Sequence, residues 1–149
     1  MRNRIAIFPG SFDPFTKGHA DIVERGLKLF DEIYIAVGHN PQKPGWMPVE
    51  MRKDSIRAVY KDNPRIHVAD YTILTADFAK EIGAEFILRG VRTAKDYEYE
   101  LQMADINRQL TGAETVVLFA DPKLASLSSS IVRELDHFGH DIEEFLPQL

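Results

Sequence analysis

Residues 5–19 read IAIFPGSFDPFTKGH, and this stretch decides how the rest of the 149-residue chain is organised. Residues 5–8 form a short apolar run, which is typical of a central parallel strand buried on both faces. Pro9, Gly10 and Pro14 follow, and we expect them to stop the strand and shape a tight loop. The stretch therefore predicts a strand that enters a Gly/Pro-rich loop.

The end of the same stretch has the pattern of a helix start. Thr16 is the predicted N-cap, so Gly18 and His19 fall in the first helical turn. The unpaired N–H groups and the positive dipole end of such a turn bind phosphate readily. Gly18 lets a ligand approach the backbone closely, and His19 is expected to point toward a bound anion. A lone histidine at a helix start is more often structural, so the functional signal is the combination of all these features.

The amino-acid composition limits the classes of protein to which the chain can belong. The chain is 44% hydrophobic and 28% charged, which is typical of one globular domain over residues 1–149. It has no cysteine, which excludes disulfides, thiolate metal sites and a cysteine nucleophile and fits a cytoplasmic protein. A net charge of −5 argues against a general nucleic-acid binder but still permits a local basic pocket. We find no membrane-length apolar run and no signal peptide.

Predicted strands and helices alternate along the chain. This order predicts an α/β fold, a single Rossmann-like domain with a five-stranded parallel sheet and helices on both faces. After the first strand we expect strands at 33–37, 66–69, 86–88 and 115–119. We expect helices at 18–30, 48–60, 74–82 and 94–110, another after residues 128–130, and a short one within 141–149.

The topology brings distant segments together. Ligands of such sheets bind at the carboxyl ends of the strands. That rule places Ser11, the loop at 38–48 and Arg89 at the same edge. The loop is expected to be mobile, and it could serve either as a simple connection or as a functional segment. The Ser128–Ser130 run could cap a helix or bind phosphate, and the apolar stripe from Tyr99 to Leu110 is more typical of a core or subunit contact than of a cofactor site.

Four blocks in this order resemble the phosphopantetheine adenylyltransferase family of the nucleotidyltransferase superfamily. The first block, Pro9–His19, contains the superfamily's T/H-x-G-H signature. The others are Asn40–Lys43, the segment Leu88–Arg92 with Asp96–Glu100, and Ser128–Arg133. The segment before the triple serine departs from the family, because Leu124–Leu127 stands where members usually carry aromatic residues.

The resemblance implies reversible transfer of AMP from ATP to 4′-phosphopantetheine, giving dephospho-coenzyme A and pyrophosphate by direct in-line attack. It implies Mg²⁺ carried on the ATP phosphates without a dedicated protein metal site, a homo-oligomer of six subunits, and coenzyme A as a feedback ligand. Two alternatives stay open, namely a transferase with another phosphate acceptor and a non-catalytic nucleotide-binding regulator on the same fold.

The resemblance also assigns roles to residues. It implies that four residues support catalysis, namely His19, Lys43, Ser11 and Arg92. It implies contacts to ATP by Ser11, Phe12, His19, Gly90, Val91, Arg92, Glu100, Leu124, Ala125, Ser126, Leu127, Ser128, Ser129 and Ser130. It implies contacts to the acceptor by Ser11, Lys43, Leu74, Thr75 and Arg89, with the Arg89 guanidinium forking onto the acceptor phosphate.

Overall fold

The computed structural model of the protein describes residues 3–149. Its strands are β1 (Ile5–Gly10), β2 (Glu32–Gly38), β3 (Ile66–Tyr71), β4 (Phe86–Val91) and β5 (Glu114–Phe119). Its α-helices are α1 (Lys17–Gly26), α2 (Val49–Val59), α3 (Thr75–Glu81), α4 (Ala94–Thr111) and α5 (Ser129–His137). Two single 3-10 turns are η1 (Pro122–Leu124) and η2 (Glu143–Phe145). The domain predicted over residues 1–149 includes Met1 and Arg2, which lie outside the described residues.

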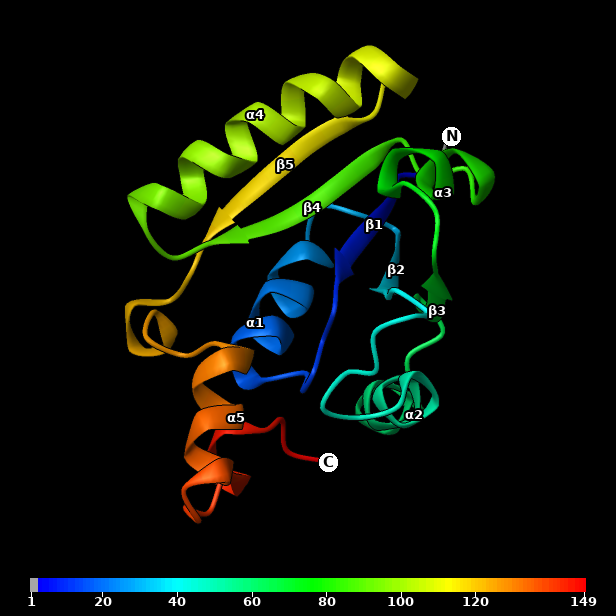
Figure 1. Cartoon of the computed structure of the whole chain (residues 1–149). Coiled ribbons are helices and arrows are strands. Elements are labelled where there is room, and N and C mark those ends of the chain that lie inside the picture. The colour runs from blue at the N-terminus through cyan, green and yellow to red at the C-terminus, as the bar shows by residue number, and fades with distance from the viewer. Residues whose placement is uncertain (1–2) are drawn as a thin grey trace.

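The five strands form one sheet, ordered β3-β2-β1-β4-β5 and parallel throughout (Figure 1). One apolar cluster joins α1 and α2 to the sheet through Val23 and Ile56. A second cluster covers the opposite face and includes Ala79 of α3. The predicted fold class is therefore confirmed, with helices on both faces.

Strand β1 occupies the centre of the sheet because its apolar residues serve both faces. Ala6 and Phe8 belong to the cluster beneath α1, whereas Ile7 belongs to the cluster on the α3 side. Ala6 and Ile7 are fully buried. This arrangement confirms the prediction drawn from residues 5–8 and explains why an unbroken apolar run suits this position.

The sheet opens between β1 and β4 toward their carboxyl ends. These strands pair only at Ala6 with Phe86 and at Ile7 with Ile87, whereas β1 stays paired with β2 as far as Gly10. The strand order also reverses here, since β2 and β3 lie on one side of β1 and β4 and β5 on the other. Ligand crevices of open α/β sheets occur at such a switch point.

Three strands extend two or three residues beyond their predicted C-terminal ends. Pro9 and Gly10 belong to β1, opposite Ala36 and Val37 of β2. Beyond Ile7 the strand has no neighbour on its β4 side, and a proline lacking an N–H group is tolerated at such an edge. Strand β3 extends to Tyr71, and β4 continues through Arg89 and Gly90 to Val91, beyond the predicted end at residue 88.

The helices also differ at their ends. Helix α1 ends at Gly26 and not at residue 30, and Arg65 caps the following turn by donating to the carbonyls of Leu27 and Phe30 at 2.6 and 2.7 Å. Pro48 and Leu74 are N-cap residues rather than first helical residues. The helix expected within residues 141–149 is a single 3-10 turn.

Within residues 3–149, we find no helix whose length and apolar character would let it span a membrane.

Candidate active site

Two neighbouring cavities open at the β1–β4 switch point. The first has a volume of about 350 Å³ and lies between the end of β1, the start of α1 and the start of α5. The second has a volume of about 270 Å³ and lies between β1, α3 and α4. They share a wall that consists of Pro9, Gly10, Ser11, Arg89, Tyr99 and Glu100. The predicted convergence of Ser11 and Arg89 is therefore present in the structure.

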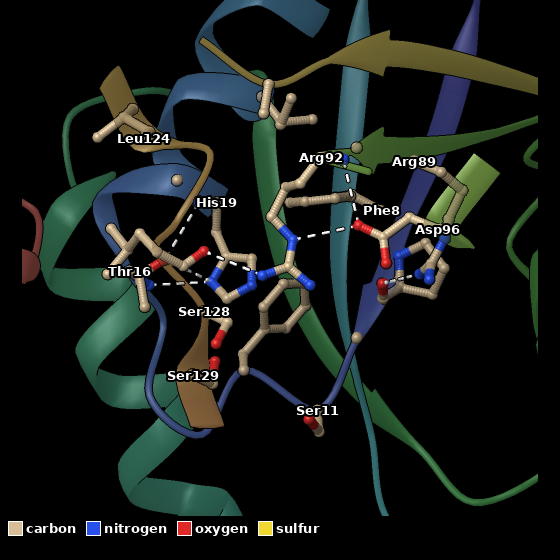
Figure 2. A pocket seen from close by; sticks show the side chains of 18 of the residues that line it. Phe8, Ser11, Thr16, His19, Arg89, Arg92, Asp96, Leu124, Ser128 and Ser129 are labelled. Atoms are coloured by element: carbon tan, nitrogen blue, oxygen red, sulfur yellow. Dashed lines mark hydrogen bonds and ion pairs between the residues drawn. The ribbon is translucent and has the colours of Figure 1, made fainter. Parts of the chain in front are cut away.

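His19 lies at the start of α1, where the predicted cap is confirmed. The Thr16 hydroxyl accepts the His19 N–H at 3.4 Å, and the His19 Nδ1 accepts the Thr16 N–H at 2.9 Å. Figure 2 shows the imidazole held against Thr16 in this way. Because Nδ1 is an acceptor, the neutral ring carries its proton on Nε2. His19 lines the first cavity and can donate from that nitrogen to an anion.

The surroundings of His19 keep it neutral. Its ring stacks on Phe15 with centroids 5.4 Å apart and meets the edge of Phe12 at 5.0 Å. Burial and, to a smaller extent, the positive charges of Arg92 and Arg89 together lower the pKa of His19 from 6.5 to about 4. A neutral imidazole among cations is a hydrogen-bond donor that needs no proton from solvent at neutral pH.

Phe12 packs beneath this site in an unusual backbone conformation. It is 2% exposed and has a φ of 47°, which lies in the left-handed region that bulky residues avoid. Strain of this kind is retained where the surrounding packing demands it, and it concentrates at functional sites. Gly10 accommodates the ring, since a Cβ there would approach the Phe12 ring to 2.9 Å.

Arg89 forms the centre of the shared wall. Its Nε and Nη2 donate to the two carboxylate oxygens of Glu100, both at 2.8 Å, and its Nη1 donates to the Pro9 carbonyl at 2.7 Å. Glu100 is 5% exposed. One fork of the guanidinium is therefore occupied by protein, and a bound phosphate would meet the remaining N–H groups of Nη1 and Nη2.

Arg92 lies on the other side of the first cavity. Its Nε donates to Asp96 at 3.2 Å and its Nη1 to the Leu127 carbonyl at 3.3 Å. The Asp96 carboxylate also accepts the backbone N–H of Arg92 at 3.1 Å, so it binds both the main chain and the side chain of the same arginine. Arg92 thus connects the start of α4 to the segment that precedes α5, with Asp96 and both arginines visible in Figure 2.

The triple serine lies at the start of α5, beyond the carboxyl ends of the strands (Figure 1). The Ser128 hydroxyl accepts the Ile131 N–H at 3.2 Å, the N-cap role that we considered for this run. The Ser129 hydroxyl donates to the Pro14 carbonyl at 2.7 Å and joins α5 to the first loop. Ser128 and Ser129 also line the first cavity, so capping and anion binding are compatible here.

The remaining predicted residues divide into two groups. Phe12, Gly90, Leu124 and Leu127 line the first cavity, and Thr75 lines the second. The others lie outside both cavities. Lys43 and Leu74 are exposed, and the other members of this group are Val91, Ala125, Ser126 and Ser130.

Sequence reasoning gave no role to several residues that the fold brings here. Tyr71 lines the second cavity and shares a 2.8 Å hydrogen bond with the Thr75 hydroxyl. Asn107, buried at 7% exposure, lines the same cavity. Tyr71 lies just beyond the predicted strand at 66–69 and Asn107 lies in the predicted helix at 94–110, and nothing in the local pattern distinguishes them from structural residues. Asp13 is inside the motif itself, and its carboxylate accepts the backbone N–H groups of Trp46 and Met47.

Comparisons with known proteins show the family to which the chain belongs. The family model described as cytidylyltransferase-like matches residues 7–135, which defines the class of protein to which this fold and site belong. The chain is 54% identical over 145 residues to the phosphopantetheine adenylyltransferase of Bacteroides thetaiotaomicron, covering 97% of this chain and 96% of the relative. It is 49% identical over 148 residues to that of Porphyromonas gingivalis, covering 99% and 97%. The chain belongs to the phosphopantetheine adenylyltransferase family.

A solved structure confirms the fold alone. The bifunctional NMN adenylyltransferase/ADP ribose pyrophosphatase of Francisella tularensis superposes with a TM-score of 0.73 at 15% identity. The match covers 97% of this chain and 45% of that one.

Proposed function

We propose that the protein transfers AMP reversibly from ATP to 4′-phosphopantetheine, giving dephospho-coenzyme A and pyrophosphate. The observation that carries this proposal is the pair of cavities with a common wall, because two anionic substrates can then meet at Ser11 and Arg89. The family relationship supports the choice of acceptor.

The chemistry needs positioning more than proton transfer. A phosphate oxygen of the acceptor attacks the α-phosphorus of ATP, and the bond to the bridging oxygen of the pyrophosphate breaks. The second pKa of a phosphate monoester is about 6, so the nucleophile is already ionised at neutral pH and requires no general base. The barrier comes from anion repulsion and alignment, which cations and oriented donors reduce.

On the nucleotide side, His19 is the central donor. Its Nε2–H, the start of α1 and Arg92 would stabilise the negative charge that develops on the phosphates. The neutral state of His19 is compatible with this role, because it donates one fixed hydrogen bond rather than a proton. The start of α5, from Ser128 to Ser130, would bind the pyrophosphate part of ATP in the same way. Residues 124–127 would close over the adenine, and Glu100 would bind the nucleotide.

On the acceptor side, Arg89 and Thr75 line the second cavity. Arg89 would hold the acceptor phosphate through its free N–H groups, and Thr75 would lie along the pantetheine arm with Leu74. Lys43, carried by the loop between β2 and α2, would bridge the acceptor phosphate and the α-phosphate of ATP. Its exposed side chain has the freedom to move toward ligands that bring negative charge.

We propose that Mg²⁺ enters with ATP. Within residues 3–149 no group of three or more His, Asp or Glu side chains is arranged to hold a metal ion. The carboxylates of Asp96 and Glu100, which line the first cavity, are each paired with an arginine. Phosphate oxygens and water would therefore supply the ligands, as is usual for Mg²⁺.

Assembly and location are further parts of the proposal. The exposed face of α4 includes Tyr99, Ile106 and Leu110, which are 58%, 48% and 55% exposed and would suit a subunit contact within a homohexamer. A solution mass near the 17.0 kDa of one chain would contradict this. We also propose coenzyme A as a feedback ligand and a cytoplasmic location, which the absence of cysteine supports.

The test is pyrophosphate release with ATP, Mg²⁺ and one acceptor at a time. We expect turnover with 4′-phosphopantetheine and none with nicotinamide mononucleotide or glycerol 3-phosphate. Turnover with a different acceptor would keep the transfer mechanism and reject the substrate. ATP binding without turnover on any acceptor would reject the proposal in favour of a nucleotide-binding regulator.

A further inference from the structure

A buried ion pair joins the loop that carries Lys43 to the loop that carries Ser11. Asp13, at 7% exposure, accepts the backbone N–H of Trp46 at 2.7 Å and that of Met47 at 2.9 Å. Its carboxylate lies 3.6 Å from the Nε of Arg52, whose side chain is 5% exposed. Each carboxylate oxygen of Asp13 thus accepts a hydrogen bond from a segment more than 30 residues away in sequence.

Arg52 completes this connection from the first turn of α2. Its Nε donates to the Met47 carbonyl at 2.8 Å and its Nη1 to the Ser11 carbonyl at 3.2 Å. One guanidinium therefore contacts both loops, and the Asp13 carboxylate balances its buried charge. Burying either the Asp13 carboxylate or the Arg52 guanidinium without its partner would be costly. Loss of one partner should therefore release the contact between the two loops.

Gly45 shows how closely the loop lies on this pair. A Cβ at Gly45 would collide with Arg52 Nη2 and would stand 2.5 Å from Asp13 Oδ2. A side chain at this position would require either the loop or the side chains of Arg52 and Asp13 to move. Gly45 is itself exposed, so the close contact is with the ion pair beneath the loop and not with the core of the domain.

The proposed catalytic mechanism does not use Asp13, Arg52 or Gly45. Lys43 stands between two fixed points, the end of β2 at Gly38 and the anchor at Trp46. A turn at Asn40, whose side chain accepts the Gln42 N–H at 2.9 Å, shapes the segment between them. The path of the Lys43 backbone relative to Ser11 is therefore determined by the anchor.

We propose that Asp13 and Arg52 are positioning residues, which hold the Lys43 loop against the Ser11 loop so that both side chains reach the same phosphates. The inference rests on the proposed adenylyl transfer for its effect on rate. The anchor itself is a separate claim, because Trp46 is the single tryptophan of the chain and reports on the loop without any turnover.

The first experiment replaces Asp13 by Asn, which removes one of two acceptors and presents an NH2 group to a backbone donor. We expect acrylamide to quench Trp46, which is 41% exposed in the anchored loop, more efficiently in the full-length D13N protein than in wild type, by up to about twofold. Asp54→Asn is the matched control, because Asp54 is an exposed carboxylate of α2 that pairs only with Arg57 at 3.3 Å. Equal quenching in wild type, D13N and D54N would overturn the anchor.

Gly45→Ala perturbs the loop without removing a charge. This variant tests the same anchor if D13N folds poorly. We expect the same gain in Trp46 quenching. Unchanged quenching in this variant would contradict the close contact described above.

The second experiment asks whether the anchor acts through Lys43. We expect D13N to lower kcat by about 10-fold to 100-fold in the wild-type background and by less than 3-fold in a Lys43→Ala background, because the residue it positions is already absent. Equal losses in both backgrounds would overturn the positioning role. Failure of wild-type turnover would reject the proposed function instead and would leave the fluorescence result to decide the anchor.

Discussion

The low pKa of His19 leads to a test of stability that needs no substrate. The change is His19→Asn, because the Asn side-chain oxygen can replace Nδ1 as acceptor for the Thr16 N–H group but does not titrate. In the unfolded chain a histidine titrates near 6.5, whereas in the folded protein His19 titrates at about 4. Between these two values the unfolded state binds a proton that the folded state does not.

The sign of the effect follows from that difference. Stability falls as the pH falls from 6.5 toward 4, since acid stabilises the unfolded state. The linkage relation gives a loss of about 2 kcal/mol at pH 5 relative to pH 7.5 for this one group. Above pH 7 both states are neutral at His19, and the residue makes no pH-dependent contribution.

The assay is urea unfolding of wild type and H19N at pH 7.5 and at pH 5. Other groups titrate in both proteins and cancel in the comparison, so the variant should lose about 2 kcal/mol less than wild type on acidification. Because burial is the main cause of the shift, 0.5 M salt should remove only the smaller part that comes from Arg92 and Arg89. Equal losses for the two proteins would refute the argument, as would an NMR titration of His19 near 6.5.

Three more substitutions have expected outcomes. His19→Ala should lower kcat by about 100-fold or more while the protein stays folded, as measured by pyrophosphate release and circular dichroism, since it removes one donor to developing charge; near-normal turnover would exclude His19 from the mechanism. Arg89→Ala should raise the KM for 4′-phosphopantetheine more than the KM for ATP, and equal increases would contradict the acceptor role. It should also destabilise the fold in chemical unfolding, because Glu100 stays buried without its partner. Arg65→Ala should cost about 1–2 kcal/mol of unfolding free energy with kcat unchanged, because Arg65 donates to three backbone carbonyls after α1 and lies outside both cavities; a stability equal to that of wild type would refute this capping role.

The order of strands and helices was predictable because apolar segments of different length alternate along the chain. The strand ends were less predictable. Pro9 normally interrupts a sheet, and only the loss of β4 as a neighbour after Ile7 makes it tolerable inside β1. That loss is a property of the whole sheet and leaves no local signal. The same divergence of strands creates the crevice, so the misplaced strand end and the candidate site have one cause.

The candidate site was predictable in its residues but not in their pairing. Thr16 and His19 are three residues apart, and the helix-start pattern predicted Thr16 as the N-cap and His19 in the first helical turn. The Arg89–Glu100 pair joins β4 to α4. From the sequence, Arg89 was expected to bind the acceptor and Glu100 to bind ATP, and no contact between the two was predicted. The pairing depends on the angle at which α4 packs on the sheet, which residue spacing does not determine. Asp13 was quoted within the motif without a role, because two of its partners are backbone N–H groups that any residue could supply, and the third, Arg52, is distant in sequence.

The wall that the two cavities share has a consequence for release of the product. Under the proposed function, the product is one molecule whose two halves occupy the two cavities, with their junction against Ser11 and Arg89. Such a ligand is bivalent, since once one half binds, the other faces its own cavity at an effective concentration of about millimolar or higher. The product dissociates only when both of its halves are unbound at the same time. The architecture that brings the substrates together therefore slows release of the joined product.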